Sequence, residues 1–194
     1  CEIAHDSGLP DEVLHLVNGT GEITGKALTE HPAIKAISFV GGTDTGKAIM
    51  RQGSSSLKRV HFELGGKNPV IVFEDADLEK ALDAVIFMIF SLNGERCTSS
   101  SRLLVQHSIL QPFLDKILER CQALKIGNPL DPETEIGPLI HGDHMAKVKN
   151  FVSLAKEEGA TVLEGGRFRE TLNKGNYIKP TIFSDATNNM QICQ

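Results

Sequence analysis

A glutamate and a cysteine are the two side chains of this sequence best suited to covalent chemistry. Cys97 precedes a run of small hydroxyl residues, which leaves room for a substrate and brings backbone N–H groups near the thiol. Glu63 ends an apolar stretch directly before a glycine pair, where a desolvated carboxylate can act as a general base. Each has an ordinary alternative: a free cysteine is often a small buried hydrophobe, and such a glutamate is often a solvated turn residue. Together, however, a thiol and a carboxylate can form a thioacyl intermediate and then hydrolyse it.

The segment FVGGTDTG predicts a nucleotide site upstream of this pair. A β-branched strand over 34–40 leads into Gly41 and Gly42, and a helix runs through Gly46. Three interpretations are open: a P-loop, another kind of cofactor turn, and an ordinary strand-to-helix connection. A P-loop needs Ser or Thr after its lysine to hold Mg²⁺, and this sequence has Ala48 there. Ala48 therefore counts against a P-loop nucleotide hydrolase, and the other two interpretations stay open.

A thiol, a carboxylate and a dinucleotide site in one chain describe the oxidation of an aldehyde to a carboxylic acid. The thiol of Cys97 would add to the carbonyl carbon, and a hydride would leave to nicotinamide. Water deprotonated by Glu63 would then attack the resulting thioester. The predicted cofactor is NAD or NADP, and the predicted partner is a small-molecule aldehyde.

Strands and helices alternate along the chain, so the elements that must position these residues form an α/β fold. Mainly parallel sheets flanked by helices are expected from this alternation. The N-terminal residues look helical at first and then turn at residues 7–10, and a short strand is expected over 14–18. The pattern then predicts strands over 34–40, 59–63, 69–73, 102–105, 161–163 and 178–183, and helices over 44–51, 77–90, 110–123 and 143–158.

Composition excludes several classes of function. The net charge is −5 and no basic patch is present, so no nucleic-acid partner is expected. No apolar run is long enough to predict a membrane span. The cysteines show no CxxC pair, which indicates a reducing, cytoplasmic location. His141 and His144 form an HxxH pattern without a third ligand, so no metal site is predicted. The four cysteines are Cys1, Cys97, Cys121 and Cys193.

Three motifs in the same order resemble those of the aldehyde dehydrogenase superfamily, and the resemblance covers essentially the whole chain. FVGGTDTG resembles the cofactor turn of that family, FELGGKNP its glutamate motif and NGERCTSSSRLLV its cysteine motif. The resemblance implies that Cys97 is the nucleophile and Glu63 the general base for deacylation. It also implies that Gly41, Gly42 and Gly46 form the turn facing the cofactor.

The same resemblance assigns further residues and a domain plan. Leu64 would lie on the nicotinamide side, whereas Lys67 and Asn68 would be structural. Residues 1–66 would be the second half of the cofactor-binding domain and residues 67–194 the first part of the catalytic domain. The chain would then have a partial aldehyde dehydrogenase fold, truncated at both ends. The intact protein would be a homo-oligomer.

The stretch MIFSLNGERCTSSSRLLVQ resembles the branch of the family that oxidises semialdehydes in aromatic-acid breakdown. A semialdehyde is therefore the expected substrate class. The rival interpretation is a catalytically silent fragment that inherits these motifs but only folds or associates.

Overall fold

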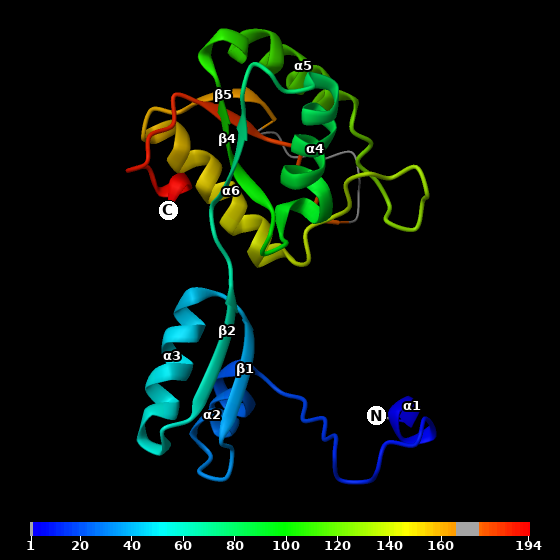
Figure 1. Cartoon of the computed structure of the whole chain (residues 1–194), viewed down its shortest axis with the longest axis vertical. Helices are drawn as coiled ribbons and strands as arrows, with labels where there is room; N and C mark the ends of the chain where they lie inside the picture. The colour runs from blue at the N-terminus through cyan, green and yellow to red at the C-terminus, as the bar shows by residue number, and fades with distance from the viewer. Residues whose placement is uncertain (1, 166–174) are drawn as a thin grey trace. The chain divides into compact units, whose positions relative to one another are not determined.

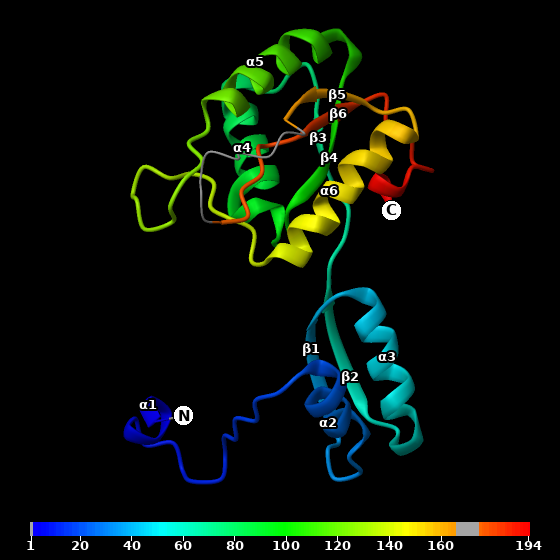
Figure 2. The ribbon, with the colours of Figure 1, turned by 180° about the vertical axis from the view of Figure 1, so that it is seen from behind.

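The computed structural model describes residues 2–165 and 175–194. The chain divides between Gly65 and Gly66 into two compact units, Cys1–Gly65 and Gly66–Gln194. Figures 1 and 2 show the ribbon of each unit from two sides. The assignment of a cofactor-binding role to the first unit and a catalytic role to the second stays a prediction.

The first unit is built on two parallel strands joined by a helix. The strands β1 and β2 pair in parallel along their whole lengths. A parallel pair needs a crossover connection, and α3 supplies it by returning the chain to the end at which β1 begins. Helix α3 packs against both strands with Ile49 buried, and both ribbon views show it alongside β2 (Figures 1 and 2). The elements are α1 (Glu2–Asp6), η1 (Gly21–Gly25), α2 (Lys26–Glu30), β1 (Ala36–Gly41), α3 (Thr43–Gly53), η2 (Ser54–Ser56) and β2 (Arg59–Leu64).

The second unit contains a parallel pair and an antiparallel pair. Strand β3 pairs with β4 in parallel, and β5 pairs with β6 in antiparallel fashion. Its elements are β3 (Asn68–Val72), α4 (Leu78–Phe90), η3 (Ser91–Gly94), β4 (Ser100–Val105), η4 (His107–Ile109), α5 (Leu110–Ala123), α6 (Gly142–Glu157), β5 (Thr161–Glu164), β6 (Ile182–Ser184) and η5 (Gln191–Cys193).

The core of the second unit lies between the β3–β4 pair and the helices α4 and α5. Val85 of α4 and Phe113 of α5 are fully buried at its centre. Asp77 caps α4 by accepting a hydrogen bond from the Lys80 N–H, and the hydrogen bonds from Lys80 lower the pKa of Asp77. The remaining buried members are Val72, Leu82, Ile86, Ile117 and Cys121.

The predicted α/β fold is confirmed, and so are most of its elements. Near the N-terminus the expected helical start is confirmed, because α1 ends at Asp6, just before the expected turn. The predicted strand over 14–18 is wrong, because these residues form no strand. Leu16 is 71% exposed there, because no neighbouring strand in the described residues pairs with this segment. The predicted strand over 178–183 shortens to β6, which starts after Pro180, a residue without a ladder N–H. Among the described residues, no helix is long and apolar enough to cross a membrane.

Candidate active site

Cys97 lies in a tight turn at the start of β4. The turn runs from Arg96 to Ser99 and is closed by the Ser99 N–H donating to the Arg96 carbonyl at 2.9 Å. Cys97 is exposed, whereas Ser99 and the following Ser100 are buried. Within residues 2–165 and 175–194, no hydrogen bond is formed by the N–H groups of Cys97 and Thr98. The turn therefore presents an accessible thiol next to free backbone donors, as expected from the sequence.

The chain enters this turn through three successive left-handed residues. Leu92, Asn93 and Gly94 have φ values of 50°, 56° and 71°. This region is natural for Gly and tolerated by Asn, but it is strained for a leucine. The Asn93 side chain offsets part of that strain by donating from Nδ2 to the Pro138 carbonyl at 3.1 Å. The reversal carries the chain directly from the end of α4 to the cysteine turn.

The residue before the thiol fastens the turn to α4. The Arg96 guanidinium lies 4.5 Å from the centre of the Phe87 ring, within the range of a cation–π contact. It also donates to Ser91 Oγ at 2.7 Å and to the Phe87 carbonyl at 3.3 Å. No local sequence pattern indicates this arrangement, because the contacts depend on the left-handed reversal before the turn.

Glu95, the residue before Arg96, links the turn to α6. Glu95 Oε1 lies 3.2 Å from His144 Nε2. His141 Nδ1 accepts a hydrogen bond from the His144 N–H at 3.1 Å and so caps the start of α6. The HxxH pattern is thus explained by a helix cap and a polar contact between His144 and Glu95. In the described parts of the chain, no group of three or more His, Cys, Asp and Glu side chains is placed to hold a metal ion.

Glu63 lies in the first unit, near the end of β2. Its register partner on β1 is Val40, and His61 Nε2 lies 3.4 Å from Glu63 Oε1. The two β2 side chains share one face because they are two residues apart. The Glu63 side chain is 61% exposed, so the desolvation expected from the sequence is not supplied by the residues described here.

The predicted cofactor glycines lie around the connection between β1 and α3. Gly41 is opposite Leu64 in the parallel pair, and Gly42 is the N-cap residue of α3, with open space at its Cβ position. Gly46 is buried, and a Cβ there would lie 3.4 Å from Leu64 Cδ2. Gly46 thus also has a packing role, because it lets the helix approach β2 closely.

The first turn of α3 fits an anionic cofactor group. Among the described residues, no side chain caps this helix at Gly42. Its first N–H groups therefore remain available to an anion, and the helix dipole favours negative charge at that end. The pyrophosphate of a dinucleotide has this chemistry. Asp44 in the same turn is fully exposed, so its carboxylate does not occupy the end of the helix.

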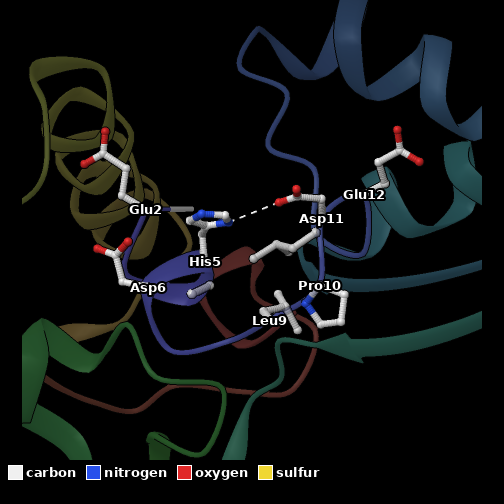
Figure 3. A pocket seen from close by; sticks show the side chains of 9 residues that line it. Glu2, His5, Asp6, Leu9, Pro10, Asp11 and Glu12 are labelled. Atoms are coloured by element: carbon white, nitrogen blue, oxygen red, sulfur yellow. Dashed lines mark hydrogen bonds and ion pairs between the residues drawn. The ribbon is translucent and has the colours of Figure 1, made fainter.

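A surface pocket at the N-terminus contains none of these residues. Figure 3 shows the His5 ring facing the Asp11 carboxylate, with a separation of 3.1 Å between Nδ1 and Oδ1. Glu2, Asp6 and Glu12 also line it, so its walls are acidic and exposed. Such a surface is unsuited to an anionic dinucleotide. Cys1 lies outside the described residues.

A strand–glycine turn–helix connection and an accessible thiol in a fastened turn agree with the family resemblance. The aldehyde dehydrogenase family model matches residues 1–194, and the chain belongs to this family. It is 46% identical over 198 residues to the 5-carboxymethyl-2-hydroxymuconate semialdehyde dehydrogenase of Escherichia coli, with 100% of this chain and 42% of that protein covered. It is 44% identical to the peroxisomal aminoaldehyde dehydrogenase 1 of Pisum sativum, with 98% and 38% covered.

Solved structures give the same result. HpcC from Thermus thermophilus superposes with a TM-score of 0.96 at 50% identity, over 100% of this chain and 38% of that one. Betaine aldehyde dehydrogenase from Staphylococcus aureus, solved in complex with NAD⁺, superposes with a TM-score of 0.96 at 36% identity, over 100% and 39%. The chain thus spans about two fifths of the length of these relatives. The predicted family and the predicted partial fold are confirmed.

Proposed function

We propose that Cys97 is the nucleophile and Glu63 the general base in the NAD(P)-dependent oxidation of an aldehyde to a carboxylic acid. This oxidation is proposed for the whole protein that contains this chain. The observation that carries the proposal is the exposed thiol in a turn fastened to α4 and α6, beside backbone N–H groups that no described residue uses. Membership of the aldehyde dehydrogenase family supports it.

In the first half-reaction the Cys97 sulfur adds to the carbonyl carbon of the aldehyde. A C–S bond forms, and the carbonyl oxygen takes up negative charge, which free N–H groups of the turn can stabilise. A bound nicotinamide would accept the hydride that leaves this carbon. The product at Cys97 is a thioester.

In the second half-reaction Glu63 removes a proton from water, and the water oxygen attacks the thioester carbon. The C–S bond breaks, the acid leaves and the Cys97 thiolate is restored. Because the Glu63 side chain is 61% exposed in this unit, an effective base also needs cover from a ligand or another part of the protein. That exposure is also what favours the second candidate, a catalytically silent chain.

The cofactor would be NAD or NADP, held by the connection between β1 and α3. Gly41, Gly42 and Gly46 would leave room for the pyrophosphate at the first turn of α3, and Leu64 would lie on the nicotinamide side. The complex of the staphylococcal relative with NAD⁺ supports this assignment.

A semialdehyde is the proposed substrate class, in line with the name of the Escherichia coli relative. A role in aromatic catabolism would follow from that substrate. The proposed setting is a cytoplasmic homo-oligomer with no nucleic-acid or membrane partner. These assignments extend the sequence interpretation and rest on the same motifs.

The test replaces the thiol in the purified protein and follows reduced cofactor as an aldehyde and NAD or NADP are supplied. Cys97→Ser should abolish aldehyde oxidation, because a hydroxyl is a far weaker nucleophile than a thiolate. Cys193→Ser is the matched control, since Cys193 is only partly buried and is assigned no chemical role. Retained turnover in Cys97→Ser would remove Cys97 from the mechanism. Inactivity of the unmodified protein would favour the silent alternative.

A further inference from the structure

The start of β3 has an interrupted hydrogen-bond ladder. Asn68 pairs with Ser100 and Pro69 with Arg102, so Ser101 of β4 has no partner in the register. Pro69 contributes to the interruption, because proline has no N–H to donate to the ladder. The ladder starts at Asn68 and Ser100, so its paired residues do not include the cysteine turn that precedes β4.

The Asn68 side chain replaces the missing ladder contacts. Its Nδ2 donates to the Cys97 carbonyl at 3.0 Å and to the Ser99 carbonyl at 3.0 Å. Both partners are acceptors only, so the atom facing them is the amide nitrogen, and both of its hydrogens are used. An aspartate of the same shape cannot make either bond, since its oxygens also accept.

These two bonds hold the backbone that follows the Cα of Cys97. The Ser99 N–H already closes the turn onto the Arg96 carbonyl at 2.9 Å. With the Cys97 carbonyl also held, the ψ angle of Cys97 is fixed, and with it the direction of the Cα–Cβ bond that carries the sulfur. Because a peptide unit is planar, the following N–H of Thr98 is turned away from Asn68.

We propose that Asn68 is a positioning residue that holds the Cys97 turn in the geometry needed for nucleophilic attack. The proposal rests on the proposed function, in which Cys97 is the nucleophile. It assigns to Asn68 more than the structural role expected from the sequence. The bonds act through the backbone of Cys97 and leave its thiol free, so substrate binding should be affected far less than the chemical step.

The test compares Asn68→Ala and Asn68→Asp with a matched control at the opposite end of the same strand pair. Gln106 is that control, because its side-chain oxygen accepts from the Glu74 N–H at 3.0 Å, remote from the turn along β4. Each variant is first checked by thermal unfolding. The readouts are kcat and KM of the protein that carries this chain, and the pH dependence of Cys97 alkylation by iodoacetamide, followed by peptide mass with Cys193 as internal reference.

Both Asn68 variants should lower kcat about tenfold or more while the KM for the aldehyde changes by less than about threefold, because misplacing a reacting group slows the chemical step. Asn68→Asp should also move Cys97 alkylation to higher pH, since a carboxylate near the thiol disfavours the thiolate. Gln106→Ala should leave both readouts close to those of the unmodified protein. If Asn68→Asp does not fold, Asn68→Ala decides the result on kcat and KM.

An unchanged kcat and an unchanged alkylation profile in folded Asn68 variants would overturn the proposal. So would an equal loss in Gln106→Ala, because the effect would then be general to the strand pair. A separate outcome concerns the proposed function alone: if Cys97→Ser keeps its dehydrogenase activity, the nucleophile assignment fails. In that case the positioning role of Asn68 is still tested by the pH dependence of Cys97 alkylation relative to Cys193. If this pH dependence is the same in the Asn68 variants and in the unmodified protein, the positioning role is overturned.

Discussion

Gly41 at the end of β1 lies directly opposite Leu64 at the end of β2. Parallel strands end at the same edge of a sheet, which is where α/β proteins bind their ligands. The register thus places the glycine turn and the glutamate motif at one edge of the first unit, although they are well separated in sequence. This relationship supports the proposal that both motifs act in one reaction.

Replacing Gly46 should disturb that edge. In Gly46→Val the new Cβ would lie 3.4 Å from Leu64 Cδ2, and the two further methyl groups would push α3 away from β2. Overpacking of this kind costs about 1–3 kcal/mol. We expect a lower free energy of unfolding for the first unit and weaker NAD binding in a calorimetric titration.

Gly25→Ala is the control for this substitution, because Gly25 also lies in a helical segment and has open space at its Cβ position. It should leave stability unchanged or slightly increase it. A Gly46→Val protein as stable as the control would show that α3 does not need this close approach.

The core of the second unit should depend strongly on one aromatic side chain. Phe113 is fully buried between α4, α5 and the β3–β4 pair. Phe113→Ala should therefore cost about 3–5 kcal/mol in urea unfolding. Leu130→Ala, at a residue that is 89% exposed, should change stability by less than about 0.5 kcal/mol. Similar losses in the two variants would contradict the described core.

Cys121 should be chemically silent while the chain is folded. Burial, followed by the nearby Glu164 charge, raises the pKa of Cys121 to about 12 from the ordinary thiol value of 9.0. At mildly alkaline pH, iodoacetamide should therefore label exposed Cys97 and leave Cys121 unlabelled until denaturant is added. Rapid labelling of Cys121 without denaturant would contradict its burial.

The same shift sets a pH dependence of stability. Above the ordinary thiol pKa only the unfolded state loses this proton, so the free energy of unfolding should fall as pH rises from 9.0 towards about 12. Cys121→Ala should remove this part of the dependence, which equilibrium unfolding at several pH values measures. An identical alkaline slope in the variant would assign the loss to other groups.

Local patterns predicted the regular elements well where packing and periodicity agreed. The helix predicted over 110–123 coincides with α5. The helix predicted over 77–90 coincides with α4 except for Asp77, which is its N-cap residue. The prediction of a short strand failed at residues 14–18, where no partner strand is present in the described residues. Pairing partners are a tertiary property, which a short window of sequence does not contain.

The roles of the site residues stay predictions, and the contacts around them could not be read from the sequence. The type and spacing of Cys97 and Glu63 indicated their chemistry, and the exposed turn agrees with a reactive Cys97. The bond from Asn68 to the Cys97 carbonyl spans 29 residues, so no local pattern announces it. The only sign of this bond in the sequence is the Asn68-Pro69 pair. It marks the start of a strand in which the proline has no N–H to donate to the neighbouring strand.

The most direct test of the central claim is the mass of Cys97 during turnover in a Glu63→Gln protein. With an aldehyde and NAD supplied, the thioester on Cys97 should form and then persist, because glutamine cannot deprotonate the attacking water. Peptide mass should show the acyl adduct on Cys97 alone, and the double variant with Cys97→Ser should show none. A normal rate of acid formation with no adduct on Cys97 would contradict the account.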